Sequence, residues 1–319
     1  MMAGQAIAAR SVQAPAAVVM VRPHHFRPNP QTAPDNAFQD NAGSRGAGLA
    51  AAAYAEVSAA AAALSAAGVK VHLFEDGDEG GTPDSVFPNN WFSTHAGGHV
   101  AIYPMFSPNR RRERRSDVID MLKRRYRVQD VIDYSGLEQD ALYLEGTGAM
   151  VLDHVERVAY VVRSNRANAV VLERFCTHFN FEPMAFDASD SLGRTVYHTN
   201  VLMCIGTAFA LLAPSMITDP ARRAEIVARL VHSGRSVIEL SEDQVCNFAA
   251  NALELSTPSG LVLALSARAL ASLDASQRDR IERSARLLAL AVPNIELAGG
   301  SVRCMLAGVH LAERGTPCT

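Results

Sequence analysis

Four polar segments of the chain carry side chains that could perform covalent chemistry, although apolar, strand-like sequence flanks each of them. They are residues 84–92, 144–148, 197–201 and 299–305. Together they supply the thiol of Cys304, the imidazole of His198 and the carboxylate of Glu145. A thiolate can attack an electrophilic carbon, an imidazole can move protons, and a carboxylate can orient the imidazole or bind substrate. The combination therefore indicates nucleophilic catalysis by a cysteine.

Each of these residues alone has a more ordinary interpretation. Cysteine is among the most commonly buried residue types, so Cys304 by itself would usually be structural. His198 would more often be a hydrogen-bonded core histidine, and Glu145, which stands beside glycines, can complete a turn. The catalytic interpretation depends on the residues occurring together and in this order.

In that order, the four segments resemble the guanidino-group-modifying, or pentein, superfamily of arginine deiminases, dimethylarginine dimethylaminohydrolases, amidinotransferases and succinylarginine dihydrolase. Glu145-Gly146, with Gly148, resembles the Glu-Gly-Gly segment of that family. His198 resembles its catalytic histidine, and Cys304 follows a Gly-Gly pair as its nucleophile does. The resemblance spans about residues 18–311 and is strongest to the arginine-deiminase-related hydrolases that include the citrulline-utilisation hydrolase.

The resemblance implies a fold and a mechanism. The fold is an α/β propeller with five-fold pseudosymmetry, built from ββαβ modules around a central polar channel. Cys304, His198 and Glu145 are then the catalytic residues of a hydrolase that acts on non-peptide C–N bonds through a covalent intermediate, without a metal or an organic cofactor. Its substrate is a small amino acid of the arginine or citrulline type.

Two further segments carry over from the same resemblance. Ser164-Asn165-Arg166 resembles a Ser-x-Arg segment whose arginine holds the substrate α-carboxylate. The run from Arg110 to Glu113 resembles an Arg-Arg-x-Glu loop that closes over the substrate in some relatives. Arg166 and Arg110 are therefore expected to bind substrate.

The chain departs from the guanidine-specific relatives at two positions that are expected to contact the guanidinium or ureido group of the substrate. Those relatives place one Asp in a Phe-x-Arg-Asp segment, and deiminases and amidinotransferases place another two residues after the histidine. Here Asn89-Asn90 and Asn200 stand at these positions. An amide donates and accepts hydrogen bonds, whereas an ionised carboxylate only accepts. The amides therefore favour a neutral ureido group, such as that of citrulline, over a guanidinium that would lack countercharge.

Other interpretations stay open at this point. In one alternative, Asn89 or Asn90 only caps a turn, and Glu145 with Asp187 or Asp190 supplies the negative charge that a guanidinium needs. Within the family, citrulline hydrolysis to ornithine, ammonia and CO2 competes with guanidine hydrolysis and with amidino transfer. Outside it, the chain could be a catalytically silent binder of arginine-like ligands, or a redox sensor that pairs Cys304 with Cys204 or Cys246.

Strands and helices alternate along the whole sequence, which predicts α/β architecture. Strands are expected near residues 16–21, 69–74, 100–103, 149–152, 158–162, 182, 201 and 294–297, and helices near residues 48–68, 114–126, 167–179, 220–232, 261–271 and 275–290. No linker divides the chain, so we expect a loose leader over residues 1–17 and a single catalytic domain over residues 18–319.

Composition restricts the partners. The 319 residues are 48% hydrophobic and carry a formal charge of -3, which is typical of a globular protein without a global basic field. The dense basic run of residues 110–127 is interpreted mainly as a solvated helix face. The alternative is that one or two of its arginines bind a small carboxylate, and nucleic-acid binding is disfavoured. The apolar stretch of residues 201–213 is too short to cross a bilayer.

The five cysteines show no Cys-x-x-Cys spacing, so free thiols are expected rather than disulfides or a zinc site. The Ala-rich start lacks the pattern of a secretory signal, which favours a cytoplasmic location. The expected partner is the small-molecule substrate alone, without nucleic acid or membrane, and the helical surfaces permit a homodimer.

Overall fold

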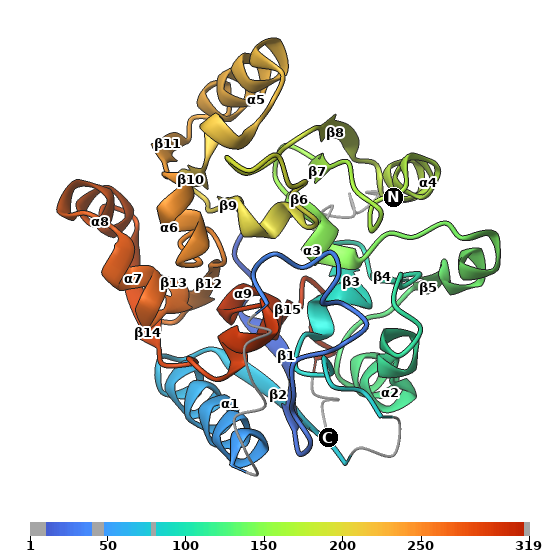
Figure 1. The fold of residues 1–319 in the computed structure, drawn as a ribbon. Coiled ribbons are helices and arrows are strands. Elements are labelled where there is room, and N and C mark those ends of the chain that lie inside the picture. The colour runs from blue at the N-terminus through green and yellow to red at the C-terminus, as the bar shows by residue number, and fades with distance from the viewer. Residues whose placement is uncertain (1–10, 40–47, 78–80, 316–319) are drawn as a thin grey trace, which may run out of the picture.

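The computed structural model describes residues 11–39, 48–77 and 81–315, and five small sheets arranged around a central axis make up its frame (Figure 1). Each sheet has three strands, of which the first two are antiparallel and the last two parallel. A helical connection links each parallel pair, because parallel neighbours need a crossover. Every module is therefore a ββαβ unit, as the sequence predicts.

Four modules follow one another along the chain. The sheets consist of β3 (Phe92–His95), β4 (His99–Ile102) and β5 (Asp130–Asp133); β6 (Met150–Asp153), β7 (Val158–Val162) and β8 (Glu182–Phe186); β9 (Met203–Ile205), β10 (Phe209–Leu212) and β11 (Ser236–Glu239); and β12 (Leu253–Thr257), β13 (Gly260–Ser266) and β14 (Ala285–Leu290). Their crossover helices are α2 (Ser116–Arg125), α4 (Ala169–Phe179), α5 (Pro220–His232), and α7 (Ala267–Ser272) with α8 (Ala275–Glu282). The first strands of these four sheets, β3, β6, β9 and β12, lie near the axis and are called the inner strands. The crossover helices lie at the perimeter (Figure 1).

The two ends of the chain complete the fifth module together. β1 (Ala17–Pro23) is parallel to β2 (Lys70–Asp76), across α1 (Leu49–Ala66), and antiparallel to β15 (Ala307–Gly308). Val19, for example, pairs with His72 on one side and with Ala307 on the other. The ring therefore closes only when residues near the C-terminus pair with the first strand.

Several short helical turns connect these elements. They are the 3₁₀ turns η1 (Pro88–Asn90), η2 (Arg110–Glu113), η3 (Ser135–Asp140), η4 (Thr199–Val201), η5 (Pro214–Met216) and η6 (Ile295–Ala298), and the short helices α3 (Gly146–Ala149), α6 (Glu242–Cys246) and α9 (Val302–Met305). Four of them lie close to the axis, because each precedes the inner strand of a module: η1 precedes β3, α3 precedes β6, η4 precedes β9, and α9 precedes β15, the inner strand of the fifth module.

Three sequence predictions near the C-terminus are wrong. Residues 261–271 contain strand β13 followed by α7, not one helix, because an all-apolar run has no period that separates a buried strand from a buried helix. The helix expected over residues 275–290 ends at Glu282, and β14 follows it. Residues 294–297 fall in η6 rather than in a strand. In the first two cases, pairing with β12 or β13 decided the local structure.

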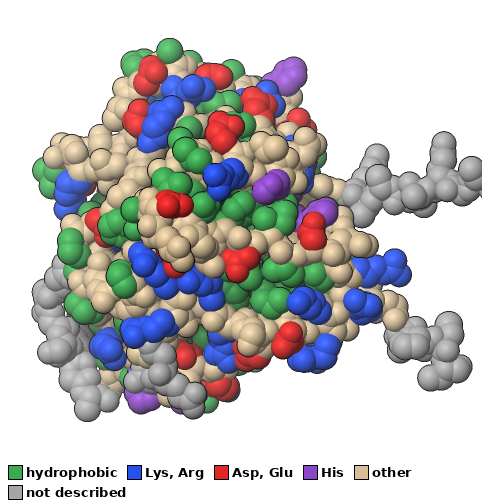
Figure 2. Space-filling model, turned by 90° about the vertical axis from the view of Figure 1, so that its right-hand side faces the viewer, with side chains coloured by type: hydrophobic (Ala, Val, Ile, Leu, Met, Phe, Trp, Pro, Cys, Tyr) green, Lys and Arg blue, Asp and Glu red, His purple; other side chains and the backbone are tan. Residues whose placement is uncertain are grey.

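The basic run behaves largely as expected. Val118, Ile119, Met121 and Leu122 form the buried face of α2. Arg114 and Arg115 form ion pairs with Glu138 and Asp117. Side chains of both charge signs are interspersed over one face of the molecule (Figure 2). Arg110 is the exception, because it is buried.

In the described ranges, α1 is the one helix whose length and composition would allow it to cross a membrane. It packs on β1 and β2 and buries Leu49, Val57 and Leu64 against the core. A core helix of this kind satisfies the same criterion, so the finding carries little weight.

The segment before β1 is anchored to the axis from Gln13 onward. The Gln13 side chain is buried, donates to the carbonyl groups of Leu152 and Ile205 at 3.0 and 3.1 Å, and accepts from the His154 N–H at 2.9 Å. The leader expected over residues 1–17 therefore differs from the structure in its last part, while residues 1–10 lie outside the described residues. Three hydrogen bonds to inner-strand segments explain the difference.

We expect His72 on β2 to make folding stability depend on pH. Burial, with Arg125 and Lys70 nearby, lowers the pKa of His72 to about 4 from an ordinary value of 6.5. Between these two values the unfolded chain binds a proton that the folded chain does not, so this contribution to stability is lost as the pH falls from 6.5 toward 4. Thermal unfolding of wild type and His72→Gln between pH 7 and 5 should show the wild type losing roughly 1–2 kcal/mol more than the variant. Parallel loss in both proteins would contradict the assignment.

Candidate active site

The polar residues of the site lie on turns that immediately precede inner strands. Asn90 stands before β3, Asn200 before β9, Asn251 before β12 and Cys304 before β15. Because the modules repeat around one axis, these equivalent positions converge at the same end of the propeller. The pseudosymmetry therefore brings together residues from distant parts of the chain.

Two glycines allow the turns to approach one another. Gly146 has φ +44, and a Cβ there would overlap the carbonyl oxygens of Asn89 and Asn90. A Cβ at Gly148 would clash with the Asn90 side chain and lie 2.8 Å from His198 Nδ1. The close approach of these turns therefore requires glycine at positions 146 and 148 of the Glu-Gly-Thr-Gly sequence.

Cys304 lies between two carboxamides. Its side chain is buried, and its Sγ accepts hydrogen bonds from Nδ2 of Asn200 and Nδ2 of Asn251, each at 3.2 Å. The Cys304 backbone N–H also donates to Oδ1 of Asn251 at 3.4 Å. Two N–H donors therefore point at the sulfur and at the space around it.

His198 and Glu145 form a buried pair. His198 Nε2 lies 2.8 Å from Glu145 Oε2, and the other Glu145 oxygen accepts from the Phe106 N–H at 3.0 Å. Burial alone would raise the pKa of Glu145, but Arg166, the His198 hydrogen bond and Arg110 outweigh it and hold the pKa well below its ordinary value. Burial lowers the pKa of His198, and Glu145 offsets part of this effect. An ionised Glu145 beside a neutral His198 is the arrangement of a general base with its orienting carboxylate.

Arg110 lies inside a cluster of acceptors. It donates from Nε and Nη2 to the two Glu113 oxygens at 2.9 Å each, and it lies 3.7 Å from both Asp84 and Glu145. The side-chain carbonyl of Asn90, in the orientation that satisfies both ends of the amide, accepts from Arg110 Nη1 at 2.8 Å. Arg110 therefore fixes the Asn90 amide at the cavity wall.

Arg166 is fully buried, and carboxylates already occupy its guanidinium. Nε donates to Asp35 Oδ2 at 3.0 Å, Nη2 pairs with the other Asp35 oxygen, and Nη1 lies 3.4 Å from Glu145 Oε2. Its guanidinium stacks over the Tyr197 ring at 4.8 Å. The pair with Asp35 shows that this guanidinium binds a carboxylate in the geometry expected for a substrate carboxylate.

These groups enclose a small cavity. Its walls are Thr32, Asn36, Asp84, Phe87, Asn90, Arg110, Arg166, Tyr197, His198, Ala298, Gly300 and Cys304. The free space is about 20 Å³, which is enough for one or two water molecules. A wider open pocket shares Asn36 and Tyr197 with it and includes Asp35. The loop that carries Asp35 and Asn36 therefore separates the inner cavity from the outside.

Most of the residues predicted from sequence meet at this cavity. Cys304, His198, Asn90, Arg110 and Arg166 line it, and Glu145 and Asn200 contact lining residues. Asn89 differs, since it is buried and does not line the cavity; Thr147 donates to its carbonyl oxygen at 3.1 Å.

The alternative charge donors, Asp187 and Asp190, do not reach the cavity. They form ion pairs with Arg163 and Arg194 instead.

Two residues of the site were missed by sequence reasoning. Asp84 lines the cavity, accepts from Asn29 Nδ2 at 2.7 Å, and has an Oδ1 without a hydrogen-bond partner among the described residues. Burial raises the pKa of Asp84, although Arg110 opposes this effect. Asn251 holds Cys304. Its position just before an inner strand, equivalent to that of Asn200, is the signal that could have found it.

Comparison with known families decides the assignment. The sequence model of the family described as N,N dimethylarginine dimethylhydrolase, eukaryotic, matches residues 22–311. The chain belongs to this family. The dimethylarginine dimethylhydrolase family lies within the guanidino-group-modifying superfamily, so the resemblance inferred from the four segments is confirmed. No curated protein sequence matches the chain.

Solved structures of the superfamily share the fold of this dimethylarginine dimethylhydrolase family member. ArgZ, an arginine dihydrolase from the ornithine-ammonia cycle in cyanobacteria, is 16% identical with a TM-score of 0.70, and unliganded AgrE is 17% identical with a TM-score of 0.71. The match covers 94% of this chain in both cases, but only 41% of the ArgZ chain and 40% of the AgrE chain. The chain thus spans about two fifths of their length.

A dimethylarginine dimethylaminohydrolase adduct with 4-chloro-2-hydroxymethylpyridine is matched over almost its whole length. It is 16% identical with a TM-score of 0.62, and the match covers 92% of this chain and 98% of that one. At these identities the likeness shows the fold, and it confirms the pentein propeller of ββαβ modules.

Proposed function

We propose that the protein is a cysteine-dependent hydrolase that cleaves the ureido C–N bond of citrulline and releases ornithine, ammonia and CO2. The observation that carries this proposal is the pair of carboxamide donors, Asn200 and Asn251, directed at Cys304 Sγ at 3.2 Å. Donors at this place suit an oxygen atom on the reacting carbon, because that oxygen gains negative charge when sulfur adds.

The hydrogen-bonding capacity of the cavity matches a ureido group. A ureido group has one acceptor oxygen and three N–H donors, whereas a guanidinium has donors only. Asn200 and Asn251 supply donors for the oxygen, while Asp84 and Glu145 supply acceptors for the nitrogens. A guanidinium offers no acceptor to these amide groups, which would keep only the Cys304 sulfur as their partner.

The proposed reaction proceeds in two balanced steps. His198 takes the proton of the Cys304 thiol as the sulfur adds to the ureido carbon. It then donates this proton to the departing nitrogen, which leaves as an amine with the electron pair of the broken C–N bond. Water, deprotonated by His198, then attacks the thiocarbamate carbon and expels the thiolate. The resulting carbamic acid splits into CO2 and the second amine. Glu145 holds the imidazolium that forms in each step.

Substrate binding requires a change at Arg166. The inner cavity is smaller than citrulline, and Asp35 already occupies the guanidinium. In the proposal, the substrate α-carboxylate replaces Asp35 on Arg166, and the loop carrying Asp35 moves to admit the substrate. This exchange orients the ureido carbon over Cys304, an effect that lowers reaction barriers by fixing geometry.

Hydrolysis of a guanidine substrate is the second candidate. The unpartnered, buried Oδ1 of Asp84 favours it, because a guanidinium needs a carboxylate partner. The name of the matched family points the same way.

Product analysis with three substrates tests the two candidates. Purified protein is incubated separately with citrulline, arginine and dimethylarginine, and ornithine, citrulline and ammonia are quantified. Ornithine from citrulline supports the proposal. Citrulline from either guanidine substrate, without turnover of citrulline itself, would overturn it.

An isosteric variant sharpens the test. Asn200→Asp replaces the Nδ2 donor by a carboxylate oxygen, so we expect kcat/KM for citrulline to fall by about 10²-fold or more. Asn168→Asp is the matched control, because Asn168 caps α4 by accepting from the Val170 N–H and aspartate caps a helix equally well. Equal activity of Asn200→Asp and Asn168→Asp would contradict the role of the donor.

A further inference from the structure

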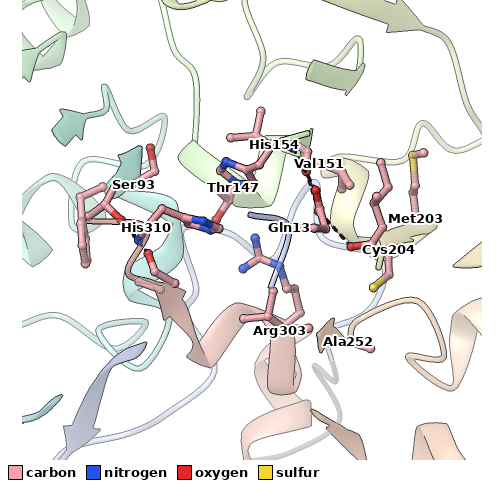
Figure 3. A pocket seen from close by; sticks show the side chains of 17 residues that line it. Gln13, Ser93, Thr147, Val151, His154, Met203, Cys204, Ala252, Arg303 and His310 are labelled. Atoms are coloured by element: carbon pink, nitrogen blue, oxygen red, sulfur yellow. Dashed lines mark hydrogen bonds between the residues drawn. The ribbon is translucent and has the colours of Figure 1, made fainter. Parts of the chain in front are cut away.

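Arg303, the neighbour of the proposed nucleophile, lines a different cavity from Cys304. This axial cavity lies among the inner strands, with Thr147, His154, Cys204 and His310 in its wall, and does not include Cys304 (Figure 3). Figure 3 shows the Arg303 guanidinium pointing into the middle of this space, toward His154 and Gln13. The cavity is therefore separate from the proposed substrate site.

The Arg303 guanidinium has almost no partner. Its one side-chain hydrogen bond runs from Nη1 to the Leu306 carbonyl at 3.1 Å, and no described carboxylate lies within ion-pair distance, 4.0 Å. Four of the five guanidinium N–H groups thus face the cavity or its wall without an acceptor.

Two neutral imidazoles lie beside this charge. The rings of His154 and His310 are stacked with centroids 3.8 Å apart. Burial, and then the charge of Arg303, lowers the pKa of His310 to about 4, and burial also lowers the pKa of His154. The His154 side chain makes no hydrogen bond with another described residue. At neutral pH these rings therefore leave the cation uncompensated, and the N–H of His154 is available as a donor, whereas the His310 ring is hydrogen-bonded to the Val12 backbone.

Arg303 is partly buried, and a partly buried cation without a counterion is destabilised; an anion that pairs with it removes part of this cost. The free space in the axial cavity is about 40 Å³, which holds about three water molecules and excludes a long organic ligand. Gln13 seals one side through its hydrogen bonds to Leu152 and Ile205. The site is thus small, positive and only partly open to solvent.

We propose that the axial cavity binds a small inorganic anion, a halide or an oxyanion of similar size, through the guanidinium of Arg303 with His154 as an additional donor. The ligand enters without displacing a protein carboxylate, because no described carboxylate pairs with Arg303. Its chemistry is independent of the reaction proposed at Cys304.

Thermal unfolding of the full chain tests the proposal. Chloride and inorganic phosphate are titrated at constant ionic strength against gluconate, which is too large for the cavity. For wild type we expect a saturable rise in Tm of roughly 3–8 °C when the anion reaches about 100 times its Kd. Arg303→Met should lose the saturable rise. Arg286→Met, which removes an exposed charge on β14, is the matched control and should keep it.

A saturable rise that persists in Arg303→Met, or no saturable rise in wild type with either anion, would overturn the proposal. A direct measurement covers the case in which Arg303→Met fails to fold. Wild-type crystals are soaked in bromide, and an anomalous peak within hydrogen-bond distance of the Arg303 guanidinium is expected. Absence of an anion at the Arg303 guanidinium both in a bromide-soaked and in a phosphate-soaked crystal would also overturn the proposal.

Discussion

Replacement of Cys304 by alanine should abolish turnover, by a factor of at least about 10⁴, while the fold is retained. The loss is expected because the Sγ that forms the covalent bond is removed, whereas Asn200 and Asn251 stay in place around the empty position. The two Nδ2 donors lose their acceptor, so we expect the free energy of unfolding to fall by only about 1–2 kcal/mol. The measurements are ornithine release from citrulline and the Tm.

A second cysteine provides the control for this experiment. Cys176 is also buried, but it packs in the hydrophobic core under α4 and does not line the cavity. Cys176→Ala should keep its activity within about two-fold and lose roughly 1 kcal/mol of stability through the small void it creates. Substantial activity in Cys304→Ala, with Cys176→Ala equally active, would refute a covalent mechanism at Cys304.

Glu145→Gln should lower both activity and stability. Glu145 holds the His198 imidazole and also lies 3.4 Å from Arg166 Nη1 and 3.7 Å from Arg110 Nη1, so it contributes negative charge to both buried guanidinium groups. Glutamine cannot compensate these charges, so we expect kcat to fall by about 10²–10⁴-fold and the unfolding free energy to fall by about 3–5 kcal/mol.

The pH dependence of Glu145→Gln shows whether its losses of activity and stability come from the missing charge beside His198. The charge of Glu145 raises the pKa of His198 against the effect of burial, so its removal should move the histidine limb of the kcat/KM profile to lower pH. Because the folded-state pKa of Glu145 is lowered, its stabilisation is present above the ordinary value of 4.5 and is lost as the pH falls. The stability difference between wild type and Glu145→Gln should therefore shrink in acid.

Glu138→Gln is the matched control. Glu138 pairs with Arg114 and Arg111 outside the cavity, so this variant should lose little activity. An unchanged pH profile together with unchanged kcat in Glu145→Gln would contradict the pairing of Glu145 with His198.

That Cys304, His198 and Glu145 meet at one site was predictable from sequence, because each stands in a short local motif that resembles the family's. Cys304 after Gly299-Gly300, His198 before an apolar strand, and Glu145 with Gly146 and Gly148 are each short patterns. Gly146 and Gly148, in particular, indicate that the backbone at these positions must lie close to another segment. The alternation of strands and helices likewise predicted the α/β class, since helix and strand periods are properties of contiguous sequence.

The sequence by itself therefore determined the reactive residue types, the family resemblance and the modular α/β plan of this protein. Only the tertiary structure decided that Asn251 contacts Cys304, that Asp84 lines the cavity, that Asp35 occupies Arg166, and that residues 261–266 form a strand. It also decided that β15 closes the ring on β1 and that Arg303 points away from the substrate site. The physical reason is that these features depend on pairings between residues far apart in sequence, and such pairings are selected by burial and hydrogen bonding in the assembled propeller rather than by local propensity.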